Sequence, residues 1–243
     1  MDERRSKMSR RALLAGSSVA AVGALTGSGA AWAGPEVGSI PVELVNANVN
    51  LALNSFSNPL ATGTINGKPV HATGSLYGGA HGGPGTITGS LAGKHLAAIL
   101  TLKDQVPSGS GYVTTAWLTA SVGDNALALS GTFNLDAGYN FVSGTITGSD
   151  RGLKVDVSTS PYSWAGNIGY GAKITGTYAG SAIAVTAKVP SGPGGSVKGT
   201  AGGKIIDLGI QSSEQPGTQL TGTFSGPPEL LAVIVGAVAF FDS

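Results

Sequence analysis

Alternation of apolar and polar residues is the dominant pattern of the chain from position 45 onward. The first alternating stretch carries apolar residues separated by asparagines, namely Val45, Ala47, Val49, Leu51 and Leu53 beside Asn46, Asn48, Asn50 and Asn54. Similar stretches cover 153–158 and 183–189. Because successive side chains of a strand point to opposite faces, this period of two predicts β-strands with one buried and one polar face.

A short phrase recurs along the same region: Gly, then Thr or Ser, then two further residues, then Gly. It covers 63–67, 74–78, 85–89, 144–148, 176–180, 199–203 and 222–226. The starts at 63, 74 and 85 are 11 residues apart, which suits one strand plus its turn, and those at 176, 199 and 222 are 23 apart, which suits a hairpin. The middle of the chain breaks this rhythm. An antiparallel meander is therefore predicted rather than a solenoid.

The third position of the phrase is predicted to lie in the core, as at Ile65, Ile87, Ile146, Tyr178 and Phe224. The flanking glycines need a reason, since glycine in a strand costs about 0.5–1 kcal/mol relative to alanine. Bulges, strong curvature or close backbone approach are the usual reasons. We therefore predict an all-β fold, an up-and-down meander of Gly-rich hairpins that closes into a barrel or a tight sandwich.

The C-terminal run from Leu230 to Phe241 is apolar throughout. Its 12 residues are too few to span a bilayer. The β-branched Val233-Ile234-Val235 favours a strand, whereas Pro227-Pro228-Glu229 is compatible with the start of a helix. We predict a buried strand here.

The N-terminus has the layout of an export leader. Arg10 and Arg11 precede an apolar run, and Ala31 and Ala33 place small side chains before a cut at Gly34. The paired arginines resemble the twin-arginine signal of exported bacterial proteins, which implies recognition by that export machinery. We therefore predict a signal peptide over 1–33, a single Gly-rich β domain over 34–243, and a secreted protein located outside the cell or in the cell envelope.

Composition narrows the function further. The chain has no cysteine, so hydrophobic burial and sheet hydrogen bonds must hold the exported form together. The predicted cleavage removes five basic and two acidic residues and leaves nine basic against eleven acidic ones. This balance predicts no nucleic-acid partner. No stable membrane span of the mature form and no cofactor are predicted either.

Catalytic signals are weak. His71, His81 and His95 lack the spacing of a metal site and are predicted to lie on the surface or in turns. The Gly-x-Ser-x-Gly elbow of α/β hydrolases is absent. Most of the aspartates lie at predicted turns or on outward faces, where solvation explains them. We therefore predict neither catalytic nor metal-ligating residues.

Four aromatic residues are candidates for ligand binding, because exposed rings can stack on sugars: Trp117, Tyr162, Trp164 and Tyr170. Ordinary packing explains the same residues. Two fragments, 131–134 and 220–224, resemble barrel strands of avidin-type proteins. That family has Trp where Phe133 stands, and the tryptophans that close over biotin are absent here. The resemblance therefore implies a meander barrel and no biotin site.

Three functions are compatible with these patterns. The favoured one is a secreted, non-enzymatic binding or interaction protein with an extracellular or cell-surface ligand. The alternatives are a secreted hydrolase of polysaccharides or esters, and a β-barrel that spans a bilayer. A hydrolase requires a His beside a Ser and an Asp, or two convergent carboxylates. A bilayer-spanning barrel requires an apolar outer band.

Overall fold

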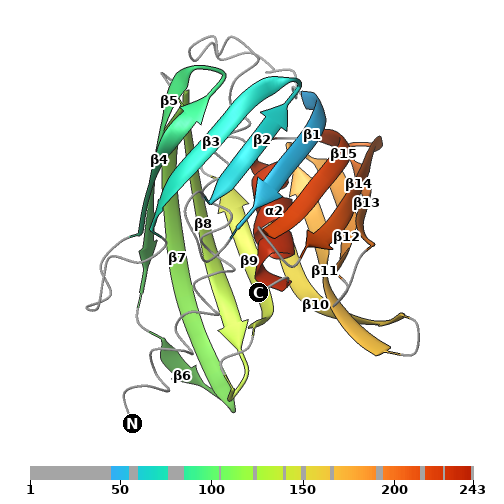
Figure 1. The fold of residues 1–243 in the computed structure, drawn as a ribbon. Coiled ribbons are helices and arrows are strands. Elements are labelled where there is room, and N and C mark those ends of the chain that lie inside the picture. The colour runs from blue at the N-terminus through green and yellow to red at the C-terminus, as the bar shows by residue number, and fades with distance from the viewer. Residues whose placement is uncertain are drawn as a thin grey trace.

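The computed structural model describes residues 45–54, 60–75, 85–103, 105–122, 125–138, 141–148, 152–164, 167–189, 194–213, 217–226 and 228–241. These residues form strands and one C-terminal helix, α2 (Figure 1). The elements are β1 (Val45–Leu53), β2 (Ala61–Ile65), β3 (Lys68–Ser75), β4 (Gly85–Leu91), β5 (Lys94–Leu102), β6 (Val106–Ser108), β7 (Gly111–Val122), β8 (Asn125–Leu135), β9 (Phe141–Gly148), β10 (Lys154–Trp164), β11 (Asn167–Tyr178), β12 (Ser181–Val189), β13 (Gly195–Ala201), β14 (Lys204–Ser213), β15 (Gly217–Gly226) and α2 (Pro228–Phe241).

The strands form a closed antiparallel barrel. Each strand pairs with the next along the chain except β5, which pairs directly with β7, and β15 returns to pair with β1. The short β6 extends the pairing beyond β5 at the start of β7, where Val106–Ser108 lie opposite Gly111–Val113. Fourteen of the fifteen described strands thus make the ring. The predicted up-and-down meander is confirmed, and its closed form is a barrel.

The period of two in the sequence separates the two faces of the wall. In β1 the alternate residues Ala47, Val49, Leu51 and Leu53 are buried, while Asn46, Asn48 and Asn50 are exposed. The central residues of the repeated phrase are all buried, as predicted: Ile65, Ile87, Ile146, Tyr178 and Phe224. Among the described residues the inner face is therefore mostly apolar, with Thr114 and Thr218 as buried polar residues, and threonines, asparagines and lysines line much of the outer face.

Close backbone approach explains several of the repeated glycines. A Cβ added at Gly176 of β11 would lie 2.1 Å from the carbonyl oxygen of Lys154 on β10. The same atom at Gly199 of β13 would lie 2.1 Å from the carbonyl oxygen of Ala184 on β12. No side chain fits at these distances, so glycine is required where neighbouring strands come this close. Of the reasons expected from sequence, close approach is the one observed at these positions.

An Asn-Gly turn fixes the pairing of β1, β2 and β3. Asn66 has a φ of 52° and Gly67 a φ of 71°, the left-handed pair that tight hairpins favour. The Asn66 side chain accepts a hydrogen bond from the Asn48 amide at 2.7 Å and donates one to the Asn46 carbonyl at 3.1 Å. These bonds continue the contact between β1 and the β2–β3 turn beyond the last paired residue of β2.

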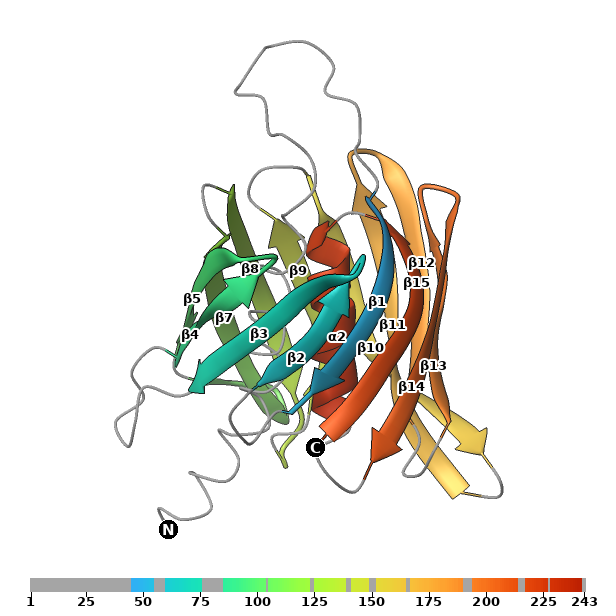
Figure 2. The same cartoon turned by 45° about the horizontal axis from the view of Figure 1, so that its top comes forward.

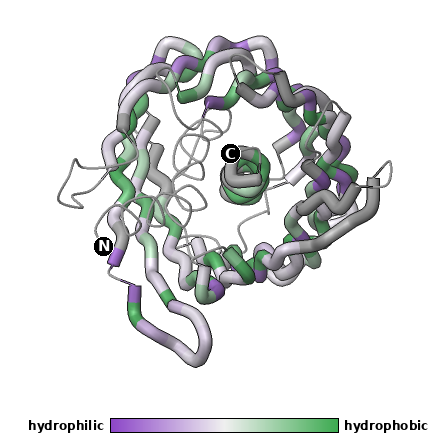
Figure 3. The backbone as a smooth tube through the Cα atoms, turned by 60° about the horizontal axis from the view of Figure 1, so that its bottom comes forward, coloured by the Kyte–Doolittle hydropathy of each residue, from purple (hydrophilic) through white to green (hydrophobic). Residues whose placement is uncertain are grey.

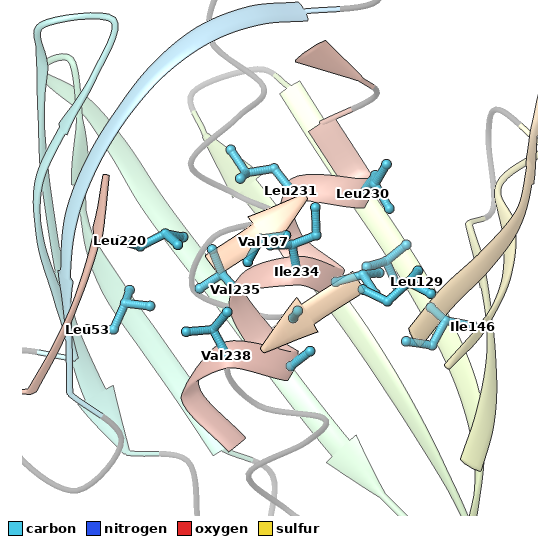
Figure 4. Close-up of a cluster of buried hydrophobic side chains, with 14 of the residues drawn as sticks. Leu53, Leu129, Ile146, Val197, Leu220, Leu230, Leu231, Ile234, Val235 and Val238 are labelled. Carbon is cyan, nitrogen blue, oxygen red and sulfur yellow. The ribbon is translucent and has the colours of Figure 1, made fainter. Parts of the chain in front are cut away.

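The C-terminal run is a helix, so the prediction of a buried strand over Leu230 to Phe241 was wrong. Helix α2 stands inside the ring of strands (Figures 2 and 3). It packs most closely against β11, β12 and β15. Leu230, Leu231, Ile234 and Val238 are fully buried among wall residues such as Leu220 (Figure 4).

Barrel size gives a physical reason for this helix. An eight-stranded barrel is filled by its own side chains. Fourteen strands about 4.8 Å apart and tilted by about 40° enclose a ring of roughly 14 Å radius. A helix about 10–12 Å across occupies the centre of such a ring. Because α2 meets apolar neighbours rather than water, its sequence is apolar all round and shows no helical stripe.

Candidate functional site

Trp117 lies on the outer face of β7, because its neighbours Ala116 and Leu118 are buried. The backbone register places it between Thr101 of β5 and Ser130 of β8. The Lys103 ammonium nitrogen is 5.0 Å from the ring centroid, in the range of a cation–π contact. The lysine thus covers a face of the ring on which a sugar could otherwise stack.

The other three aromatic candidates occupy the end of the β10–β11 hairpin. In the backbone register Tyr162 pairs with Gly169, Trp164 with Asn167, and Tyr170 with Pro161. Their side chains lie outside the described parts of the structure. Strands β8 and β9 separate this hairpin from Trp117 on β7, so the four candidates do not form one cluster along the sheet.

Several further sequence predictions fall on residues outside the described ranges. These are the export arginines Arg10 and Arg11, the cleavage residues Ala31 and Ala33, and His81. Of the other two histidines, His71 is exposed on β3 and His95 is exposed on β5. Both positions agree with the predicted surface placement.

Three lysines from different strands gather on the outer wall around Thr186. In the register, Thr186 of β12 lies opposite Lys173 of β11 and opposite Lys198 of β13. Lys188, two residues along β12, is diagonal to both. Diagonal neighbours in a sheet are about 7–8 Å apart, a separation comparable with the Debye length at physiological salt. We call Lys173, Lys188 and Lys198 the lysine patch.

Two described carboxylates border the lysine patch, since Asp207 of β14 lies opposite Lys198 and Asp156 of β10 is diagonal to Lys173. The Lys198 ammonium lies 3.4 Å from a carboxylate oxygen of Asp207 on β14, with side chains 66% and 56% exposed. An ion pair this exposed is worth about 0–1 kcal/mol and leaves both groups accessible to a ligand. Among the described residues, the patch therefore has three lysines against two aspartates.

Sequence reasoning missed the lysine patch. Its members are 10 to 25 positions apart, and each one alone is an ordinary outward residue of an alternating strand. Only the register of β11, β12 and β13 brings them together. The alternation around 173, 188 and 198 indicates that each lysine faces outward. It does not indicate which residues of neighbouring strands lie beside each lysine.

Comparisons with known proteins add no family to this description. No protein-family model, curated protein or solved structure matches the chain. Among the described residues, no three of His, Cys, Asp and Glu are grouped so as to hold a metal ion. Within the same ranges, no helix has both the length and the apolarity that crossing a membrane requires.

Proposed function

We propose that this protein is exported and acts outside the cytoplasm as a non-enzymatic binding protein. Its ligand is an acidic polysaccharide, and the lysine patch of Lys173, Lys188 and Lys198 is the contact surface. The leader with Arg10, Arg11, Ala31 and Ala33 supports export. The juxtaposition of three lysines on β11, β12 and β13 is the observation that carries the proposal.

The outer wall is the surface available for this contact. Helix α2 stands within the barrel, and its Leu230, Ile234 and Val238 side chains are fully buried. The inner face is mostly apolar and the outer face carries hydroxyl, amide and ammonium groups. A soluble polar ligand finds hydrogen-bonding partners on the outside of this barrel.

The chemistry of the patch favours an acidic saccharide. The lysines supply charge, and the hydroxyls of Thr186 and Thr200 lie beside them for hydrogen bonds to sugar hydroxyls. Ile205 pairs with Thr200 and is 70% exposed, which gives an apolar contact at the edge of the patch. By analogy with lysines near an anionic surface, each is worth about 1 kcal/mol, or roughly fivefold in affinity.

The polarity of the wall favours this proposal over a barrel that spans a bilayer. A spanning barrel turns an apolar band toward lipid, and a lysine at mid-depth costs it about 2–4 kcal/mol. Here Lys173, Lys188 and Lys198 all point outward from neighbouring strands. The hydrolase alternative requires a His beside a Ser and an Asp. His71 of β3 and His95 of β5 both lie opposite Ser90 of β4, but no described acidic residue lies opposite these three residues.

The test measures binding of purified protein to polygalacturonate, with neutral dextran as the comparison. We expect binding to polygalacturonate that weakens as salt is raised, and none to dextran. Lys173→Gln and Lys188→Gln should each weaken binding about fivefold. Asp207→Asn should strengthen it, because it removes the carboxylate beside Lys198.

Lys68→Gln is the matched control. Lys68 is exposed on β3, which is separated from β12 by β2, β1, β15, β14 and β13 around the ring. It makes the same change of charge away from the patch and should leave binding unchanged. Equal binding to dextran, or a loss in Lys68→Gln as large as in Lys173→Gln, would overturn the proposal.

A further inference from the structure

Two histidines flank a serine in one row across the outer wall. His71 of β3 lies directly opposite Ser90 of β4, and Ser90 lies directly opposite His95 of β5. Their chain neighbours Val70, Leu91 and Leu96 are buried, so all three residues of the row belong to the outer face. His71 and His95 are exposed and Ser90 is half-buried. The row is defined by the register of three strands and lies away from the lysine patch.

The spacing of this row suits a metal ion. Each cross-strand step separates Cβ atoms by about 4.5–5.5 Å, which puts the two histidine Cβ atoms roughly 10 Å apart. An imidazole side chain followed by a metal–nitrogen bond of about 2.0–2.1 Å spans half of that separation. An ion held by both rings therefore sits above Ser90, whose hydroxyl lies between them.

We propose that His71 and His95 bind one divalent transition-metal ion of the zinc, nickel and copper class. Neutral imidazole is a preferred ligand of these ions. The strands fix the backbone positions of both ligands before the ion arrives, which lowers the ordering cost of binding. Water completes the coordination, because the described residues place no third His, Cys, Asp or Glu at this point. The site is accordingly open and exchangeable.

The surroundings set the strength of the site. Thr62 of β2 lies opposite His71 and continues the row with another hydroxyl. Lys94 precedes His95 in β5, and its positive charge opposes cation binding. Two imidazoles beside a lysine predict weaker binding than a structural zinc site with four ligands. The inference does not depend on the proposed saccharide ligand.

The test titrates untagged, EDTA-treated protein with Zn²⁺ and Ni²⁺ in a calorimeter. We expect one ion per chain, with reversal by EDTA. His71→Gln and His95→Gln should each weaken binding by roughly tenfold or more, at least the loss seen when groups supporting a metal ligand are removed. His81→Gln is the matched control, since it removes the third histidine of the chain, and it should leave the affinity unchanged.

A gain of affinity distinguishes a shared site from two independent histidines. Ser90→His puts a third imidazole between the other two and should tighten binding, because three protein ligands with one water make a zinc site of ordinary coordination. The inference would be overturned if Ser90→His bound metal no more tightly than the unsubstituted protein. It would also be overturned if the His71→Gln/His95→Gln double variant bound metal as tightly as the unsubstituted protein. Loss of binding in His81→Gln alone would overturn it too. Thermal unfolding of each variant checks that the barrel is intact.

Discussion

Replacing Gly176 with alanine tests whether the glycines set the spacing of the barrel strands. The new Cβ would lie 2.1 Å from the Lys154 carbonyl oxygen and 2.7 Å from the Val155 Cα. Cβ atoms essentially never approach other heavy atoms closer than 3.0 Å, so β10 and β11 must separate locally. The atoms in the way belong to the backbone, and no side-chain rotation relieves the clash.

The cost follows from the separation that the methyl group imposes. Overpacking costs about 1–3 kcal/mol, and weakening two ladder hydrogen bonds adds about 0.5–1.5 kcal/mol each. The lower entropy of an unfolded alanine returns about 0.4–1 kcal/mol. Gly176→Ala should therefore destabilise the barrel by about 1–6 kcal/mol, and each kcal/mol lowers Tm by roughly 2–4 °C for a chain of this size.

Gly209→Ala is the matched control on the same wall. Its Cβ would meet Thr221 atoms at 3.7 and 3.8 Å, which is ordinary van der Waals contact. This variant should be neutral or up to about 1 kcal/mol more stable. Urea unfolding and thermal melts followed by circular dichroism measure both changes. Equal stability of Gly176→Ala and Gly209→Ala would refute the argument from close strand approach.

Three further substitutions examine the helix and the turns by the same unfolding measurements. Ile234 on α2 is 0% exposed, so Ile234→Ala should cost about 2–5 kcal/mol of stability. Ile205 is 70% exposed, so Ile205→Ala should change stability by less than about 0.5 kcal/mol. Equal losses of stability in the two variants would contradict the interior position of α2. Asn66→Ala should cost about 1–3 kcal/mol, because it removes two hydrogen bonds to β1, including that from Asn48. An unchanged urea midpoint would show that these two hydrogen bonds do not stabilise the barrel. Ala179 has a φ of 47°, so Ala179→Asn should raise stability by up to about 1 kcal/mol, since asparagine adopts this conformation more readily; a lower Tm would disprove it.

Several strands were predictable from sequence because each of them carries its own signal. The alternation in β1 separates the buried Val49 and Leu51 from the exposed Asn50, and burial of one face enforces this arrangement. Helix α2 was not predictable in the same way. A short segment that is buried on every side lacks a period, and the β-branched residues at 233–235 pointed to the wrong structure.

The two sites on the outer wall could not be predicted from sequence for a different reason. The lysine patch and the row of His71, Ser90 and His95 each depend on the register of three neighbouring strands. A pattern with a period of two tells which face a residue occupies, and a shift of two residues preserves that face while changing every cross-strand neighbour. Pairs between strands therefore required the structure.

The last seam of the barrel joins residues from opposite ends of the described chain. Val45 pairs with Gly226, and the Ser225 hydroxyl lies 2.8 Å from the side-chain oxygen of Asn46, which is 179 positions away. Until β15 has been synthesised, a partly formed sheet has two unpaired edge strands and an exposed apolar face. Unpaired edges and exposed apolar surface make nascent chains prone to aggregate. Contacts this distant in sequence also form slowly. Because the barrel closes only when β15 pairs with β1, its wall is completed only after nearly all of the described strands have been made.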